Sequence, residues 1–127
     1  MFHAAARRCV AVDAADLALR RKIFAAFAAV GSPPALDEDL TSLAEQHVIA
    51  LDDDGRVWMA HPFAAHREGA RVESGGRVWW GNCAWDGLGI VHALVRQTKR
   101  PRQRATREYE WSVDHRIGGK RTTRARA

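Results

Sequence analysis

The chain has 127 residues, of which 46% are hydrophobic and 28% are charged, and its formal net charge is +5. This length predicts one domain, or one small domain with an appendage. The longest uncharged apolar stretch, residues 23–30, is far too short to span a bilayer, so we expect no membrane association. Two cysteines, Cys9 and Cys83, are too few for a disulfide framework. We also recognise no secretory signal. The two cysteines therefore indicate a reducing compartment, and we expect cytoplasmic localisation.

The positive charge is concentrated at one end of the sequence. Residues 1–95 carry 9 Lys or Arg against 12 Asp or Glu, whereas residues 96–127 carry 11 against 3. The second segment also has few large apolar residues and no helical or strand period. Residues 96–127 are therefore predicted to form a disordered basic tail.

Two helices are predicted in the first half of the chain. Asp13 is placed to cap the first helix, which the prolines of residues 31–34 end. Its apolar positions recur at helical spacing, at Leu19, Ile23, Phe27 and Val30. The second helix is predicted over residues 35–47, with an acidic first turn. Its expected buried face consists of Leu36, Leu40, Leu43 and Ala44.

Short strands follow the two helices. Apolar runs on either side of the Asp-Asp-Asp-Gly sequence at residues 52–55 predict a hairpin, which residues 61–63 (His-Pro-Phe) interrupt. A second strand pair is predicted at residues 70–73 and 77–80, and a third helix from residue 82 or 83 through 95. Together these elements predict an α+β fold, with a helical and hairpin N-terminal region over residues 1–60.

The candidate site lies within residues 79–89. Cys83 sits where a strand gives way to a helix, and unpaired backbone N–H groups at a helix start favour a thiolate. Asp86, three residues later, lies on the same helical face. A thiolate beside a carboxylate holds a soft metal and passes a proton. The alternative interpretation is structural, with Cys83 a small buried hydrophobe and Asp86 a helix cap.

Other residues give weaker signals. His61 either approaches the candidate site or is a solvated or core-edge histidine. The remaining histidines at positions 47, 66 and 92 show no metal-ligand spacing with the cysteines. Four tryptophans are expected in the core, with the alternative that one ring lines a pocket for an apolar substituent: Trp58, Trp79, Trp80 and Trp85.

A family resemblance rests on three stretches. NCAWDGLGI, at residues 82–90, resembles the Cys-Ala-x-Asp segment of the alkylmercury (organomercurial) lyases. The strands that precede that segment in the family resemble two stretches of this chain, LDDDGRVWMAHPF and GGRVWW. The opening of the family's winged-helix-like region resembles LALRRKIFAAFAAVGSPP. The resemblance covers residues 16–95. It implies a winged-helix-like N-terminal region at residues 1–60, followed by the beginning of a mixed lyase-like catalytic domain at residues 61–95.

The resemblance also implies a chemistry. In that family, two cysteine thiolates take the mercury and an aspartate helps to move a proton to the carbon, which serves mercury detoxification. When the family's residues are carried over to this sequence, Cys83 matches the first cysteine and Asp86 matches the aspartate. The resemblance therefore implies that both are mercury ligands. The second cysteine has no counterpart, so we expect a shortened, C-terminally truncated lyase that uses an exogenous low-molecular-weight thiol and no resident cofactor. Its expected partners are that thiol and an organomercurial or Hg(II), not nucleic acid.

Two alternatives remain open. The first is a non-enzymatic, winged-helix-like DNA-binding or thiol-responsive regulator that contacts phosphates with the basic tail. Residues 31–47 leave room for one helix where a complete winged helix needs two, which counts against this interpretation. The second alternative is an inactive, truncated gene product.

Overall fold

The structure is a computed structural model that describes residues 13–98, 111–117 and 120–122. These residues form helices and two antiparallel sheets with strand orders β1-β2-β3 and β5-β4-β6-β7, which confirms the α+β class. The elements are α1 (Ala14–Val30), α2 (Thr41–Glu45), β1 (Ala50–Leu51), β2 (Val57–Ala60), β3 (Phe63–Ala64), β4 (Ala70–Ser74), β5 (Arg77–Gly81), α3 (Ala84–Thr98), β6 (Ser112–Ile117) and β7 (Lys120–Thr122). No helix in these ranges is both long and apolar enough to cross a membrane.

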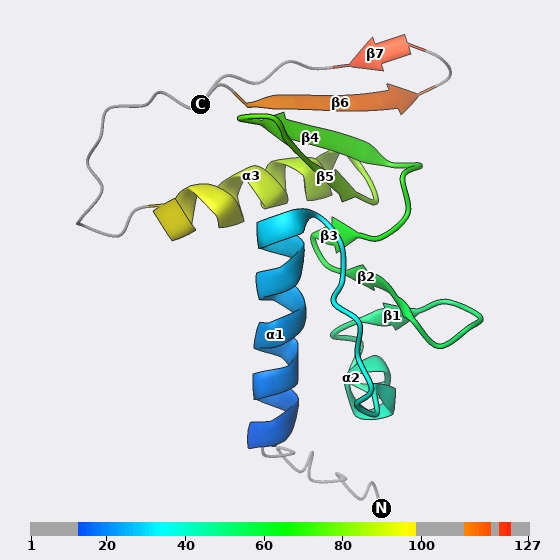
Figure 1. The fold of residues 1–127 in the computed structure, drawn as a ribbon. Helices are drawn as coiled ribbons and strands as arrows, with labels where there is room; N and C mark the ends of the chain where they lie inside the picture. The colour runs from blue at the N-terminus through cyan, green and yellow to red at the C-terminus, as the bar shows by residue number, and fades with distance from the viewer. Residues whose placement is uncertain (1–12, 99–110, 118–119, 123–127) are drawn as a thin grey trace, which may run out of the picture.

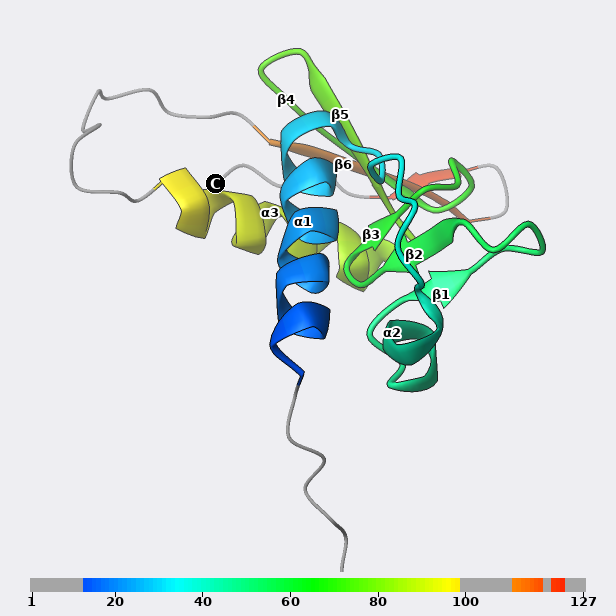
Figure 2. The same ribbon diagram turned by 60° about the horizontal axis from the view of Figure 1, so that its bottom comes forward.

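The helices occupy different positions around the two sheets. Helix α3 packs along one face of the larger sheet, against β4, β5 and β6 (Figure 1). Helix α1 contacts β5 and α2, and β3 contacts β5, so the smaller sheet adjoins the larger one (Figure 2). The Trp79 indole N–H on β5 donates to the Ala28 carbonyl at 3.0 Å, a buried bond that joins the larger sheet to the end of α1.

Helix α1 begins where the sequence predicts. The Asp13 carboxylate accepts the Ala15 N–H at 3.0 Å and so satisfies a donor that lacks an intrahelical partner. At the other end, the Gly31 N–H donates to the Phe27 carbonyl at 2.8 Å. Both boundaries therefore follow from local signals in the sequence.

The buried stripe of α1 differs from the prediction in its last turn. Ile23 and Phe27 are fully buried, as predicted, whereas Val30 is 71% exposed. The prediction that Val30 belongs to the buried stripe is therefore wrong. Ala28 is buried instead, because this is the residue whose carbonyl meets Trp79 on β5.

Helix α2 is much shorter than the helix predicted over residues 35–47. The N-cap residue of α2 is Leu40, which makes no side-chain capping bond, and the preceding Asp39 carboxylate accepts the Thr41 N–H at 2.9 Å. The hydrogen bond from the Thr41 side chain, followed by that from its N–H, lowers the pKa of Asp39. Leu40 and Leu43 are nevertheless buried, so the apolar positions are right although the helix bounds are wrong.

The first hairpin is confirmed. The Asp52 carboxylate accepts the N–H groups of Asp54 and Arg56 at 3.0 and 2.9 Å, and these bonds shape the turn between β1 and β2. The interruption at residues 61–63 is also confirmed. Strand β2 ends at Ala60, and β3 returns antiparallel to it, with Ala60 opposite Phe63.

The second strand pair and the third helix lie where the sequence predicts them. Strands β4 and β5 pair in continuous register from Ala70 opposite Gly81 to Ser74 opposite Arg77. Each strand is one residue longer than predicted. Helix α3 starts at Ala84 and continues past the predicted end at residue 95 to Thr98.

The prediction of a disordered tail over residues 96–127 is wrong for residues 96–98, which belong to α3, and for residues 111–117 and 120–122, which include β6 and β7. Strand β6 pairs antiparallel with β4, with Val113 opposite Val72. Trp111 is 6% exposed, and its ring centroid lies 5.9 Å from that of Trp79. This burial depends on a strand far away in the sequence, so no local period reveals it. Residues 99–110, 118–119 and 123–127 of the expected tail lie outside the described residues.

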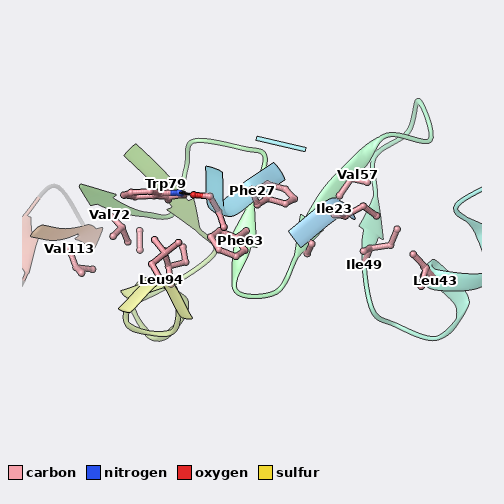
Figure 3. Close-up of a cluster of buried hydrophobic side chains, with 14 of the residues drawn as sticks. Ile23, Phe27, Leu43, Ile49, Val57, Phe63, Val72, Trp79, Leu94 and Val113 are labelled. Atoms are coloured by element: carbon pink, nitrogen blue, oxygen red, sulfur yellow. Dashed lines mark hydrogen bonds between the residues drawn. The ribbon is translucent and has the colours of Figure 1, made fainter. Parts of the chain in front are cut away.

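One cluster of buried side chains runs through both sheets (Figure 3). Its members lie on both sides of residue 60, so the two expected regions share one core. Phe27 and Phe63 stack at the middle of this cluster, with ring centroids 5.4 Å apart. The expectation of core tryptophans holds for Trp79, but Trp58 and Trp85 are 40% and 81% exposed. For those two residues the expectation is wrong.

Replacing Trp111 with alanine should lower the free energy of unfolding by roughly 3–5 kcal/mol, because a buried aromatic ring leaves a cavity. Trp85→Ala is the matched control, since its exposed ring should contribute less than about 0.5 kcal/mol. Equilibrium unfolding in urea measures both variants. Equal stability of the two would contradict the placement of residue 111 in the core.

Candidate functional site

The candidate site is the start of α3. Strand β5 ends at Gly81 and α3 begins at Ala84, so Cys83 lies at the predicted strand-to-helix junction. The Cys83 carbonyl accepts the Gly87 N–H at 3.0 Å, which makes Cys83 the N-cap residue. Its side chain is half-buried. A thiol at this end of a helix lies in the positive field of the helix dipole. The other cysteine, Cys9, lies outside the described residues.

Asp86 lies in the first turn of α3, and its side chain is only 5% exposed. Both carboxylate oxygens have partners. Oδ2 accepts the Asn82 N–H at 3.2 Å, and Oδ1 lies 3.1 Å from Nδ1 of His61. The bond to Asn82 is a capping contact, as the structural interpretation expected. The contact with His61 is additional and gives this carboxylate a titratable neighbour.

His61 belongs to the turn between β2 and β3, and its side chain is 73% exposed. The sequence left open whether it approaches the site or is solvated, and the structure shows both. The one sequence signal is the Pro62 that follows it and ends β2. A Cβ atom at Gly89 of α3 would lie 3.2 Å from the Pro62 Cβ atom, so this turn packs closely against the helix.

Two glycines of the NCAWDGLGI region set the position of α3. A Cβ atom at Gly81 would lie 2.8 Å from the Asp86 Cβ atom, a distance that side chains do not tolerate. A Cβ atom at Gly87 would lie 2.8 Å from Cγ1 of Val113 on β6. Glycine at these positions lets the first turn of α3 rest directly on the sheet, which brings Asp86 to the end of β5.

An open cleft of about 390 Å³ lies beside His61. It is lined by side chains from α1, from α2 and from the residues after α2, including Asp16, Arg20, Phe24, Gln46 and His47. The Asp16 carboxylate accepts hydrogen bonds from Ser42 at 2.6 Å and Gln46 at 2.8 Å. The Arg20 guanidinium lies 5.0 Å from the centroid of the Phe24 ring. His61 therefore lines the cleft and also contacts the buried Asp86.

His47 lines the cleft together with His61, whereas His66 is engaged elsewhere. His66 accepts the Glu68 N–H through Nδ1 at 3.4 Å, and its ring centroid lies 4.8 Å from that of Trp58. Across the ranges that the structure describes, no three His, Cys, Asp or Glu side chains are grouped so that they could hold a metal ion. The side chains that do converge are Asp86 and His61, one turn of helix from Cys83.

Comparison with known proteins returns no family model, no curated protein and no solved structure that matches this chain. The resemblance to the alkylmercury lyases therefore stays a prediction from the sequence. It depends on residues 82–90 and on the order of the elements around them.

Replacing Gly81 with alanine should destabilise the protein by about 1–3 kcal/mol, because the added methyl group forces Asp86 away from the end of β5. Gly55→Asn is a suitable control, since no atom lies within 4 Å of the position and asparagine tolerates its φ of 75°. Thermal and urea unfolding compare the two variants. A Gly81→Ala protein as stable as the control would contradict the close contact between β5 and α3.

Proposed function

We propose that the start of α3 is an alkylmercury lyase-like site that takes an organomercurial as substrate and cleaves its carbon–mercury bond. The observation that carries this proposal is the placement of a half-buried thiol at the N-cap of α3 and a buried carboxylate in its first turn. Hg(II) is a soft cation that thiolates bind strongly, and cleavage requires a proton donor at the departing carbon. Cys83 supplies the first group and Asp86 the second.

The proposal extends to the fold. Helices α1 and α2 with the smaller sheet correspond to a winged-helix-like N-terminal region, and β4, β5 and α3 correspond to the beginning of a lyase-like catalytic domain. The order of these elements supports this correspondence, as does the position of Cys83 directly after β5. The shared core then explains how the first region holds the second in place.

The reaction begins with exchange of thiolates. The Cys83 thiolate bonds to the mercury of a substrate R–Hg–SR′, and R′S⁻ leaves. A second thiolate, from a low-molecular-weight thiol, then binds the same mercury and raises the electron density at the attached carbon.

Asp86 completes the reaction. Its protonated carboxyl group gives a proton to the carbon, and the electron pair of the carbon–mercury bond forms the new C–H bond. The hydrocarbon R–H leaves, Hg(II) stays on the two thiolates, and Asp86 is left as a carboxylate. Asp86 is suited to this task because the Asn82 N–H fixes one of its oxygens and burial excludes bulk water.

Cys83→Ser should lose both stoichiometric mercury binding and hydrocarbon release, because a hydroxyl is a poor ligand for Hg(II). Asp86→Asn should keep mercury binding but slow hydrocarbon release by about 10²-fold or more, since the amide keeps the shape of the carboxyl group without a transferable proton. Mass spectrometry measures bound mercury, and gas chromatography measures benzene released from a phenylmercury compound with excess thiol.

Cys9→Ser serves as the matched control for loss of a thiol and should retain both properties. Full mercury binding and turnover by Cys83→Ser would overturn the proposed site. Binding without any hydrocarbon release by the unaltered chain would reduce the function to capture of mercury.

A further inference from the structure

We propose that the cleft between α1 and α2 binds a free α-amino acid with an apolar side chain. The carboxylate of this ligand pairs with Arg20, and its ammonium group pairs with Asp16. The cleft is lined by neither Cys83 nor Asp86. Binding of the amino acid therefore does not depend on the proposed lyase function.

The lining of the cleft combines apolar and polar side chains. Its volume of about 390 Å³ suits a small ligand, since small-molecule sites span roughly 300–1,000 Å³. Leu43 is only 2% exposed and gives the cleft a buried apolar wall. The other apolar residues of the lining are Leu17, Phe24 and Val48. The polar residues are Asp16, Arg20, Gln46, His47 and His61.

Asp16 and Arg20 carry opposite charges one turn apart on α1. Four residues along a helix correspond to a rise of about 6 Å, and an aspartate and an arginine at this spacing ordinarily pair. Here they do not pair with each other, and neither forms an ion pair within the described residues. Both line the cleft. The cleft therefore presents a separated negative and positive charge.

Asp16 is held by α2, which lies beside the first half of α1 (Figure 1). Its Oδ2 atom accepts both hydrogen bonds, from the Ser42 hydroxyl at 2.6 Å and from the Gln46 amide at 2.8 Å. Its Oδ1 atom accepts no hydrogen bond within the described part of the chain. The carboxylate is thus fixed in position while one oxygen still lacks a donor.

Arg20 is held by an aromatic ring instead of a carboxylate. Its guanidinium carbon lies 5.0 Å from the centroid of the Phe24 ring, a cation–π contact. Such a contact leaves the N–H groups able to donate, and their forked geometry matches a carboxylate. Arg20 therefore lacks an acceptor, just as Asp16 lacks a donor.

A zwitterion supplies both missing partners. The formal charges of Asp16 and Arg20 cancel, so a simple anion or cation would be attracted by one residue and repelled by the other. An α-amino acid carries its ammonium and carboxylate groups on one carbon atom, so it can reach both residues at once. Its side chain then lies against the apolar lining, where a charged side chain would lose its hydration.

Isothermal titration calorimetry with the full chain tests this assignment. L-Phenylalanine should bind at least about tenfold more tightly than phenethylamine, which lacks the carboxylate, and than 3-phenylpropanoate, which lacks the ammonium group, because each analogue loses one charge-assisted contact. L-Glutamate, whose side chain is charged, should bind more weakly than phenylalanine.

Two variants connect these preferences to the two residues. Arg20→Gln should weaken phenylalanine binding at least about tenfold and leave phenethylamine binding unchanged. Asp16→Asn should weaken phenylalanine binding to a similar degree and leave 3-phenylpropanoate binding unchanged. The amide oxygen of asparagine still accepts the hydrogen bonds from Ser42 and Gln46, and retained binding of 3-phenylpropanoate shows that this variant folds.

Arg21→Gln and Asp53→Asn are the matched controls, since both residues are exposed and neither lines the cleft. Both controls should bind phenylalanine like the unaltered chain. Absence of phenylalanine binding at millimolar concentration would overturn the proposal. Equal binding of phenylalanine and 3-phenylpropanoate would make the cleft a site for anions and would also overturn it. Unchanged phenylalanine binding by Arg20→Gln and Asp16→Asn would overturn the assignment of these residues.

Discussion

The buried carboxylate of Asp86 joins three parts of the chain. It belongs to the first turn of α3, it accepts the N–H of Asn82 after β5, and it contacts His61 after β2. Within the described ranges, Ser74 is the other polar side chain that is buried to a similar degree. A buried carboxyl group that loses its hydrogen-bond partners is costly, so both contacts have to persist for the start of α3 to keep its shape. The site geometry and local stability therefore depend on the same few hydrogen bonds.

The core determines where that carboxylate lies. Gly87 rests on Val113 of β6, and Trp111, just before β6, packs against Trp79 of β5. Trp79 in turn bonds to the end of α1 through the Ala28 carbonyl. A continuous set of contacts thus runs from α1 through the larger sheet to the first turn of α3. Cys83 is half-buried at this turn, held by rigid elements rather than by a long loop, which suits a group that has to meet a substrate in a defined geometry.

The features that the sequence predicts correctly are those with local causes. The Asp13 cap, the hairpin turn at Asp52 and the position of Cys83 at a strand-to-helix junction all depend on residues a few positions apart. The features it misses depend on distant partners. Strand β6 exists through its pairing with β4, and the contact between His61 and Asp86 needs the β2–β3 turn to pack on α3. No periodicity encodes either of them.

The central claim is that Cys83 and Asp86 act on one substrate at the start of α3. Anomalous diffraction from crystals treated with a phenylmercury compound, without added thiol, tests it most directly, because it locates the mercury without relying on turnover. We expect one strong mercury peak on the Cys83 sulfur, with the phenyl carbon beside the Asp86 carboxyl group. Mercury bound to Cys9 or to surface histidines, with Cys83 unmodified, would contradict this claim.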